Sequence, residues 1–237
     1  MFVMTKNEIL LYLESNQNEK VAKMYQTNHD LKVYGVKITD LRNLAKQIKI
    51  DVNLSKSLSD EPTYETIFLS ILIEDPAHVS LERLEHLARL GQKTAIIDQA
   101  LADLVLNSNY TIETLTSWHQ SDDDNLRYAF YATYQSFLRK RDLPEIDTAF
   151  GLKVLDQIKK TLLDEDINIQ NAMNNLVVMA GLHVPSLVLK AYEVAEHIGY
   201  VLPLKAKNSC NIQSALDYLE RYKDNPKYSR VAKLNLS

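Results

Sequence analysis

Apolar residues recur at intervals of three and four along almost the whole chain, as in Leu41, Leu44, Ala45 and Ile48. This spacing places apolar side chains on one face of an α-helix. No segment alternates apolar and polar residues for long enough to indicate a strand, so the pattern predicts an all-α protein. The predicted helices cover residues 5–15, 18–26, 39–49, 62–74, 80–90, 93–107, 111–119, 123–140, 145–163, 167–181, 185–198 and 212–223.

Residues that favour helix starts agree with these ranges. Thr39 and Ser80 are predicted N-caps, and Pro62 and Pro185 suit first helical positions. The acidic run 122–124 precedes another helix, where negative charge interacts favourably with the helix dipole. This explanation is preferred over a metal or acid/base site for the same carboxylates.

The short connections imply antiparallel neighbouring helices, stacked in pairs. Such a stack, without a strict sequence repeat, predicts a curved α-solenoid with a concave face. A closed bundle is the alternative, and periodicity does not separate the two. With only 5 Gly and 6 Pro and no linker-like stretch, residues 1–237 are predicted to form a single domain.

The net charge of −4 disfavours extensive contact with a polyanion. Charge is uneven, however, because residues 205–237 carry seven Lys and Arg against three acids. This basic end either faces nucleic acid or is a solvated helix surface. Cys210 cannot form an internal disulfide, and no leader sequence or membrane span is recognisable, so we expect a cytoplasmic protein.

Several classes of site lack their sequence signatures. Neither a GxGxxG nor a GxxxxGK[ST] phosphate loop is present, which excludes the common nucleotide-binding motifs. No His lies one helical turn from another His or from Cys210, so no zinc site is predicted. We expect no cofactor and no metal.

Three segments resemble the AlkD-type, HEAT-like-repeat DNA alkylation repair family. The first is Tyr34–Arg42, which approaches a helix through Gly35. The second runs from Trp118 through Arg127 to the basic end of its helix, and the third is Ile169–Asn175, with an IQxA run. Their order and spacing extend the resemblance over nearly the whole chain.

The resemblance implies a C-shaped stack of helical pairs that binds double-stranded DNA as a monomer. It also implies hydrolysis of the N-glycosidic bond of cationic N3- or N7-alkylpurines, at a site where one Asp lies between two Trp. A carboxylate assists a bond broken through oxocarbenium-like charge, and indole faces attract cations.

By the same resemblance, Asp98 occupies the position of the catalytic carboxylate, while Thr94 and Asn175 stand where the two Trp are expected. The only tryptophan, Trp118, fills neither position and is retained as a further candidate for the substrate cleft. The resemblance assigns DNA contact to Arg127. Other candidate phosphate contacts, for which solvated surface charge is the alternative, are Arg139, Lys140, Arg141, Lys205 and Lys207.

Loss of two cation–π contacts costs about 1–4 kcal/mol, or roughly ten- to a thousandfold in rate. Asp98 also lies beside an apolar stripe, where an Asp is commonly a solvated flanking residue. We therefore expect a protein that interacts weakly with DNA and whose alkylpurine excision is lost or much reduced. Two alternatives are an active glycosylase that uses Asp98, with tyrosines in place of the tryptophans, and a protein-binding helical-repeat scaffold.

Overall fold

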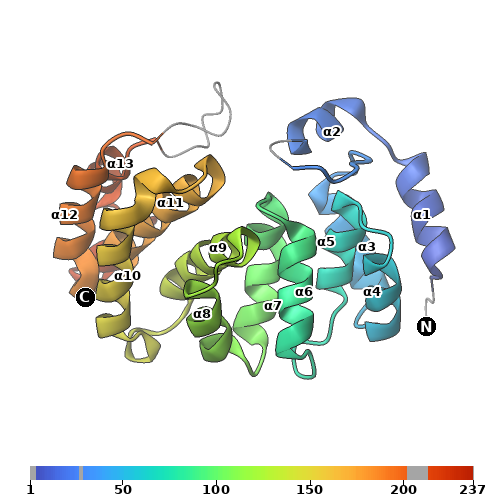
Figure 1. The fold of residues 1–237 in the computed structure, drawn as a ribbon, viewed down its shortest axis with the longest axis horizontal. Coiled ribbons are helices and arrows are strands. Elements are labelled where there is room, and N and C mark those ends of the chain that lie inside the picture. Colours follow the sequence, from blue (N-terminus) through green and yellow to red (C-terminus); the bar gives the residue numbers. More distant parts are fainter. Residues whose placement is uncertain (1–3, 27–28, 202–212, 237) are drawn as a thin grey trace. The chain divides into compact units, whose positions relative to one another are not determined.

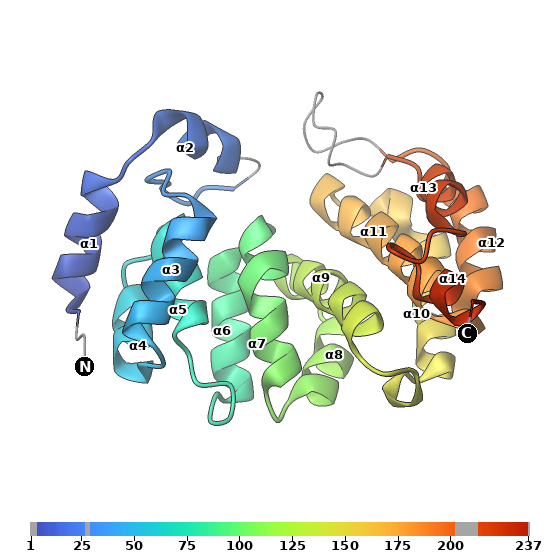
Figure 2. The same ribbon diagram turned by 180° about the vertical axis from the view of Figure 1, so that it is seen from behind.

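The computed structural model describes residues 4–26, 29–201 and 213–236. In these ranges the regular elements are helices, joined by loops that contain two isolated bridges, Lys32 with Thr63 and Tyr200 with Ser214 (Figures 1 and 2). The predicted all-α class is confirmed. Within the same ranges, no helix combines the length and apolar character needed to span a membrane.

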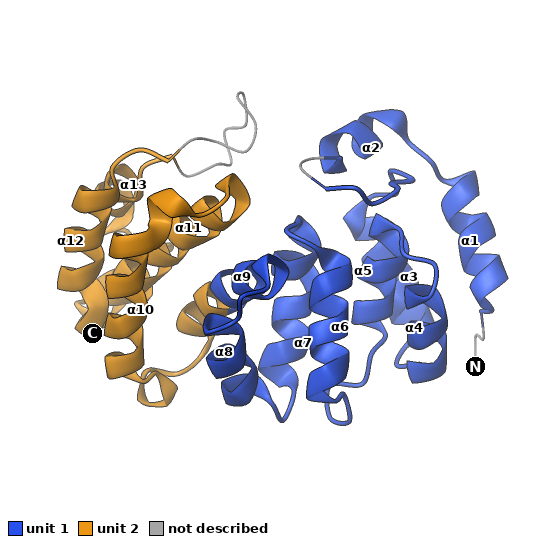
Figure 3. Cartoon of the chain, in the orientation of Figure 1, with its two compact units in different colours: residues 1–133 blue, residues 134–237 orange. Residues whose placement is uncertain are grey.

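The chain divides into two compact units, residues 1–133 and 134–237 (Figure 3). The division falls inside α9 (Asp124–Lys140). Organisation as one domain, expected from the sequence, stays a prediction.

Unit 1 consists of successive helices that lead into α9. They are α1 (Lys6–Ser15), α2 (Glu19–Tyr25), α3 (Ile38–Ile48), α4 (Val52–Ser59), α5 (Tyr64–Leu72), α6 (Leu81–Gly91), the π-helical turn η1 (Ile97–Leu101), α7 (Ala102–Asn107) and α8 (Thr111–His119).

Unit 2 begins in the last turns of α9. Its further elements are η2 (Leu143–Glu145), α10 (Thr148–Thr161), η3 (Leu162–Asp164), α11 (Ile167–His183), η4 (Pro185–Leu187), α12 (Val188–Ile198), α13 (Ala215–Tyr222) and α14 (Arg230–Leu234).

Some helix boundaries differ from the prediction for identifiable reasons. Helix α5 begins at Tyr64 and not at Pro62, because the hydroxyl of Thr63 caps the helix in a reciprocal pair with Thr66. Thr39 lies inside α3, whose N-cap is Lys37, whereas Ser80 caps α6 as predicted. Pro185 starts a short 3-10 turn ahead of α12 and not α12 itself.

Helix α5 forms the centre of unit 1. Eight of its nine residues are buried, and it contacts α3, α4, α6 and η1. Helices α3 and η1 therefore both pack against α5.

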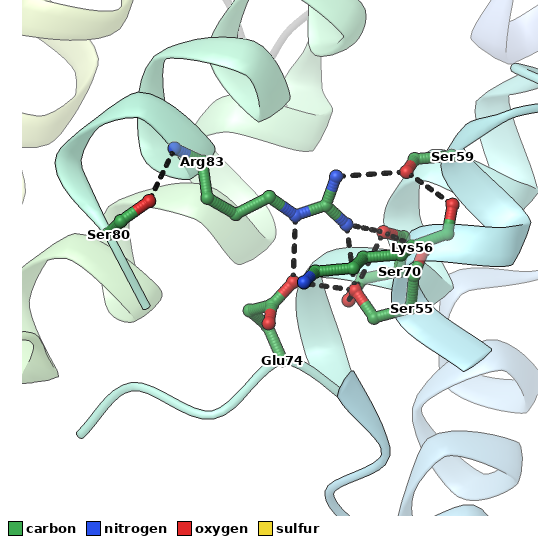
Figure 4. Close-up of polar contacts among 7 residues, drawn as sticks. All are labelled: Ser55, Lys56, Ser59, Ser70, Glu74, Ser80 and Arg83. Carbon is green, nitrogen blue, oxygen red and sulfur yellow. Dashed lines mark hydrogen bonds and ion pairs between the residues drawn. The ribbon is translucent and has the colours of Figure 1, made fainter. Parts of the chain in front are cut away.

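A polar cluster fastens α4, α5 and α6 together (Figure 4). Arg83 Nε donates to Glu74 Oε2 at 3.0 Å, and both side chains are largely buried, at 12% and 2% exposure. The remaining guanidinium nitrogens donate to serine hydroxyls of α4 and α5, at Ser55, Ser59 and Ser70. Because several hydrogen bonds satisfy each charged group, the cost of desolvating the ion pair is offset.

Close helix packing forms the core of unit 2, where α11 contacts α12, α13 and α14. Gly181 of α11 permits this approach. A Cβ at that position would lie 2.6 Å from Leu219 Cδ2 and 3.2 Å from Ala191 Cβ. A larger residue would therefore push α13 and α12 away from α11.

Candidate functional site

Asp98 lies in the π-helical turn η1, and its side chain is partly buried. The Tyr128 hydroxyl from α9 donates to Asp98 Oδ2 at 3.1 Å and lies 3.4 Å from the Thr94 carbonyl oxygen. A π-helical turn inside a helix is uncommon and is frequent at functional sites. Asp98 is thus a positioned carboxylate and not a freely solvated flanking residue.

Thr94 serves as a local cap at the start of the same segment. It is 5% exposed, its hydroxyl donates to the Gly91 carbonyl at 2.7 Å, and it accepts from the Ile96 amide at 3.2 Å. The Thr94 side chain therefore helps to shape the segment that carries Asp98 and offers no aromatic face beside it.

Two tyrosines of unit 1, Tyr64 and Tyr128, lie near Asp98, and their rings are buried. Tyr64 is 1% exposed and Tyr128 is 7% exposed. Burial raises the pKa of the Tyr64 hydroxyl, and nearby negative groups, including Asp98, raise it further. The ring of Tyr64 stacks with the rings of Tyr25 and His29, at centroid distances of 4.8 and 5.9 Å.

A buried carboxylate holds the loop that leads into α3. Glu65 accepts hydrogen bonds from the backbone amides of Tyr34, Gly35 and Val36, at 3.0, 2.7 and 3.2 Å. Burial raises the pKa of the Glu65 carboxyl, and the three amide donors oppose that rise. Gly35 has φ +86°, and a Cβ there would lie 2.1 Å from the Asn18 carbonyl oxygen, which explains the glycine of the first motif.

One cavity lies between α3 and the η1–α7 segment and is called here the α3–η1 groove. Its volume is about 500 Å³. Arg42 borders it and donates to both the carbonyl and the side-chain oxygen of Gln99, at 3.1 and 2.8 Å. The lining residues are Arg42, Ala45, Lys46, Lys49, Ile50, Leu72, Gln99, Ala100 and Asp103.

A second cavity, called here the α6 hollow, lies at the end of α6 and has a volume of about 580 Å³. Arg89 at its edge forms an ion pair with Asp123 at 2.8 Å, and Lys93 lies 3.7 Å from Asp124. Burial raises the pKa of the Asp123 carboxyl, but hydrogen bonds from Arg89 and backbone amides outweigh it and leave that pKa below its ordinary value. The lining residues are His29, Asp30, Arg89, Gln92, Lys93 and Asn125.

Both cavities border the segment 92–103, which carries Asp98. Each cavity is also lined by a helix C-cap residue that has a positive φ without being glycine. This residue is Lys49 in the α3–η1 groove, with φ 68°, and Gln92 in the α6 hollow, with φ 50°. The corresponding position after α12 is Gly199, at φ 61°. Glycine normally adopts this backbone conformation, so the two longer side chains are kept at a conformational cost.

The cationic residues predicted from the sequence occupy different surroundings. Arg127 donates to the carbonyls of Ser121 and Asp122 and to the Asp124 carboxylate at 2.7 Å, so it stabilises the turn before α9. The three predicted basic residues at the end of α9 belong to unit 2, and Lys205 and Lys207 lie outside the described residues. The contact of any of these residues with DNA stays a prediction.

At the end of α9, Arg139 and Lys140 are exposed and Arg141 is partly buried. Arg230 of α14 donates to the carbonyls of Arg139 and Arg141. The C-terminal end of α9 is therefore capped by an arginine from a distant part of the sequence.

The two remaining predicted cleft residues differ in their burial and in the unit to which they belong. Trp118 of α8 is 0% exposed, so its ring offers no surface to a bound substrate in this structure. Asn175 of α11 is partly buried and belongs to unit 2. Of the three predicted cleft residues, Thr94 is the one that the structure places in the same segment of unit 1 as Asp98.

Sequence reasoning missed Tyr128 as the partner of Asp98 and missed the cations of the α3–η1 groove. A signal for the cations was present, because Arg42, Lys46 and Lys49 are spaced to share one helix face. No comparable signal existed for Tyr128, whose contact with Asp98 spans 30 residues. In the part of the chain that is described, no three His, Cys, Asp or Glu side chains are grouped so as to hold a metal ion.

The model of the family described as "DNA alkylation repair enzyme" matches residues 9–219. The chain belongs to this family. The membership expected from the three motifs is confirmed, and the match extends across both units.

Relatives of similar length occur in Listeria. Uncharacterized protein Lmo0209 of Listeria monocytogenes is 24% identical over 232 residues, covering 95% of this chain and 100% of the relative. Uncharacterized protein Lin0241 of Listeria innocua is 25% identical over 226 residues, covering 92% of this chain and 97% of the relative.

A solved structure has the same fold. It is described as belonging to "a new family of proteins related to the HEAT-like repeat DNA glycosylases with affinity for branched DNA structures". The TM-score is 0.83 at 21% identity, covering 95% of this chain and 96% of that chain. The predicted HEAT-like-repeat fold is thereby confirmed.

Proposed function

We propose that this protein binds DNA, with a preference for branched structures over linear duplex, and that its alkylpurine excision is lost or much reduced. The observation that carries the proposal is the excess of cations over acids in the lining of both cavities beside segment 92–103, where each cavity has one acid, Asp103 or Asp30. The branched-DNA affinity of the proteins with the same fold supports the preference. We further propose that the protein acts as a monomer.

The negative net charge does not oppose binding at short range. Charges farther apart than about 10 Å are screened at an ionic strength of 0.1 M. Phosphates within the groove or the hollow therefore interact chiefly with the nearby Arg42, Lys46, Lys49, Arg89 and Lys93. Because only a few cations contact the phosphates, the binding is weak, and it falls as the salt concentration rises.

Loss of excision is supported by the surroundings of Asp98. Its carboxylate accepts a hydrogen bond from Tyr128, and the ring of Tyr64 nearby is buried. A cationic base or sugar therefore finds no exposed aromatic face on Tyr64 or Tyr128, and Thr94 supplies none.

The branched-DNA preference is tested with a four-way junction and a linear duplex of the same base composition, labelled and titrated by fluorescence anisotropy at low salt. We expect the junction to bind more tightly, and the double variant Lys46→Gln/Lys93→Gln to weaken binding to both. The matched control is Lys20→Gln/Lys153→Gln, which removes the same charge from exposed positions. Equal affinity for junction and duplex would contradict the preference.

Active excision is the second candidate function, favoured by the positioned, partly buried Asp98 carboxylate. A carboxylate so placed could stabilise the oxocarbenium-like transition state. The test is release of N7-methylguanine and N3-methyladenine from methylated duplex DNA by the wild type and Asp98→Asn. Rapid release of the methylated bases by the wild type, but not by Asp98→Asn, would show that the protein is an active glycosylase and that excision is not lost.

A further inference from the structure

We propose that the α3–η1 groove holds an unpaired nucleotide of the bound DNA, with the base against its apolar residues and the flanking phosphates on its cations. This inference rests on the proposed DNA binding. It identifies the unpaired nucleotide at a branch point as the part of the branched DNA that the groove binds. Branch points expose nucleotides that linear duplex keeps paired.

Four of the nine residues that line the groove are apolar: Ala45, Ile50, Leu72 and Ala100. The two alanines have small side chains, which leave room beside them. Ile50 lines the groove and is 59% exposed, so its side chain is available to a bound base. The volume of about 500 Å³ falls within the range for small-ligand sites and accommodates a nucleobase.

Three cations and one acid, Asp103, line the groove. Arg42, Lys46 and Lys49 follow one another along α3 and its C-cap, and all three are exposed. Arg42 is oriented by its two hydrogen bonds to Gln99 across the groove. Apolar residues beside cations match the requirements of single-stranded DNA, whose bases stack or pack while phosphates follow positive charge.

The backbone at Lys49 supports a role for these cations. Lys49 adopts φ 68° and ψ −162°, a conformation that is essentially confined to glycine. The strain places a lysine side chain at the groove and Ile50 directly after it. A glycine would relieve the strain but would remove the charge.

The test compares a fully paired four-way junction with the same junction carrying a short unpaired thymine segment at its branch point. We expect the unpaired segment to raise the affinity about tenfold, in line with the contribution of one or two contacted bases. Ile50→Ala should remove most of this gain and leave the affinity for the fully paired junction unchanged, whereas Lys46→Gln should weaken binding to both junctions. Their matched controls are Leu189→Ala, at an exposed leucine of unit 2, and Lys153→Gln.

The two proposals fail in different ways. If the fully paired junction binds and the unpaired segment adds nothing, or if Ile50→Ala weakens both junctions equally, the nucleotide site is wrong while DNA binding stands. If neither junction binds, the proposed function fails and this inference fails with it. Both variants change exposed side chains, and their thermal unfolding curves establish that they fold.

Discussion

The hydroxyl of Tyr128 donates a hydrogen bond to the carboxylate of Asp98, with 3.1 Å between the two oxygens. The bond joins α9 to the π-helical turn and fixes the one carboxylate to which the family resemblance assigns catalysis. Tyr128→Phe should lower the free energy of unfolding by about 1 kcal/mol, because it removes a largely buried hydrogen bond without changing the ring. Urea denaturation measures the effect.

Tyr200→Phe is the matched control for this change, because Tyr200 is 73% exposed and should tolerate the loss of its hydroxyl. An unchanged stability of Tyr128→Phe would show that the hydrogen bond does not hold η1 in place.

The buried pair of Glu74 and Arg83 should be sensitive to the loss of one partner. Arg83→Met leaves the Glu74 carboxylate, which is 2% exposed, without its charge partner. The expected loss is about 3 kcal/mol in the free energy of unfolding. Lys159→Met removes a cation from the more exposed pair with Glu193 and should cost at most about 1 kcal/mol. Similar losses in the two variants would contradict the structural role of the cluster in Figure 4.

His183 should make stability depend on pH in the acidic range. Burial lowers the pKa of its imidazole from 6.5 to about 4, and the charges of Arg230 and Arg139 contribute to the decrease. Between pH 6.5 and pH 4, the unfolded chain therefore binds a proton on His183 that the folded chain does not. The contribution of the neutral His183 to the free energy of unfolding is thus fully present above pH 6.5 and is lost as the pH falls towards 4.

The comparison that isolates this contribution is the free energy of unfolding at pH 7.5 and pH 5 for His183→Gln and the wild type. The variant should lose less stability between the two pH values. His197→Gln, at an exposed histidine, should behave as the wild type. An identical pH dependence in His183→Gln and the wild type would mean that His183 titrates normally in the folded chain.

The sequence predicted most of the helices because burial follows their apolar periodicity, as in α3 and α6. It missed α4, where Leu54 and Leu58 are the only large buried side chains among serines and polar residues. That helix is stabilised by the Asp51 cap and by packing on α5, and packing is not visible in a local pattern. Helix α14, with five residues, was also missed.

The site was predicted less completely than the fold. Asp98 and Thr94 lie together because they are one turn apart, but the π-helical turn and Tyr128 depend on contacts between distant segments. Trp118, chosen for its residue type, is buried. Residue type and spacing therefore identified the segment, while the environment of each side chain required the structure.

Lys49→Gly should separate stability from binding. Because Lys49 has a backbone conformation favoured by glycine, the variant should gain about 1 kcal/mol in the free energy of unfolding. It should also bind the junction with the unpaired segment several-fold more weakly. Gly199→Ala provides the reverse control, since open space surrounds Gly199 and only the positive φ opposes a side chain there. A less stable Lys49→Gly would contradict the assignment of strain.

The salt dependence of junction affinity tests whether cations beside segment 92–103 bind the DNA backbone. For the wild type, the logarithm of the association constant should fall linearly with the logarithm of the salt concentration, by about 0.9 for each phosphate contacted. Lys46→Gln/Lys93→Gln should reduce that slope by about 2. Absence of junction binding at low salt, or the same slope in wild type and variant, would show that these cations do not bind the DNA backbone.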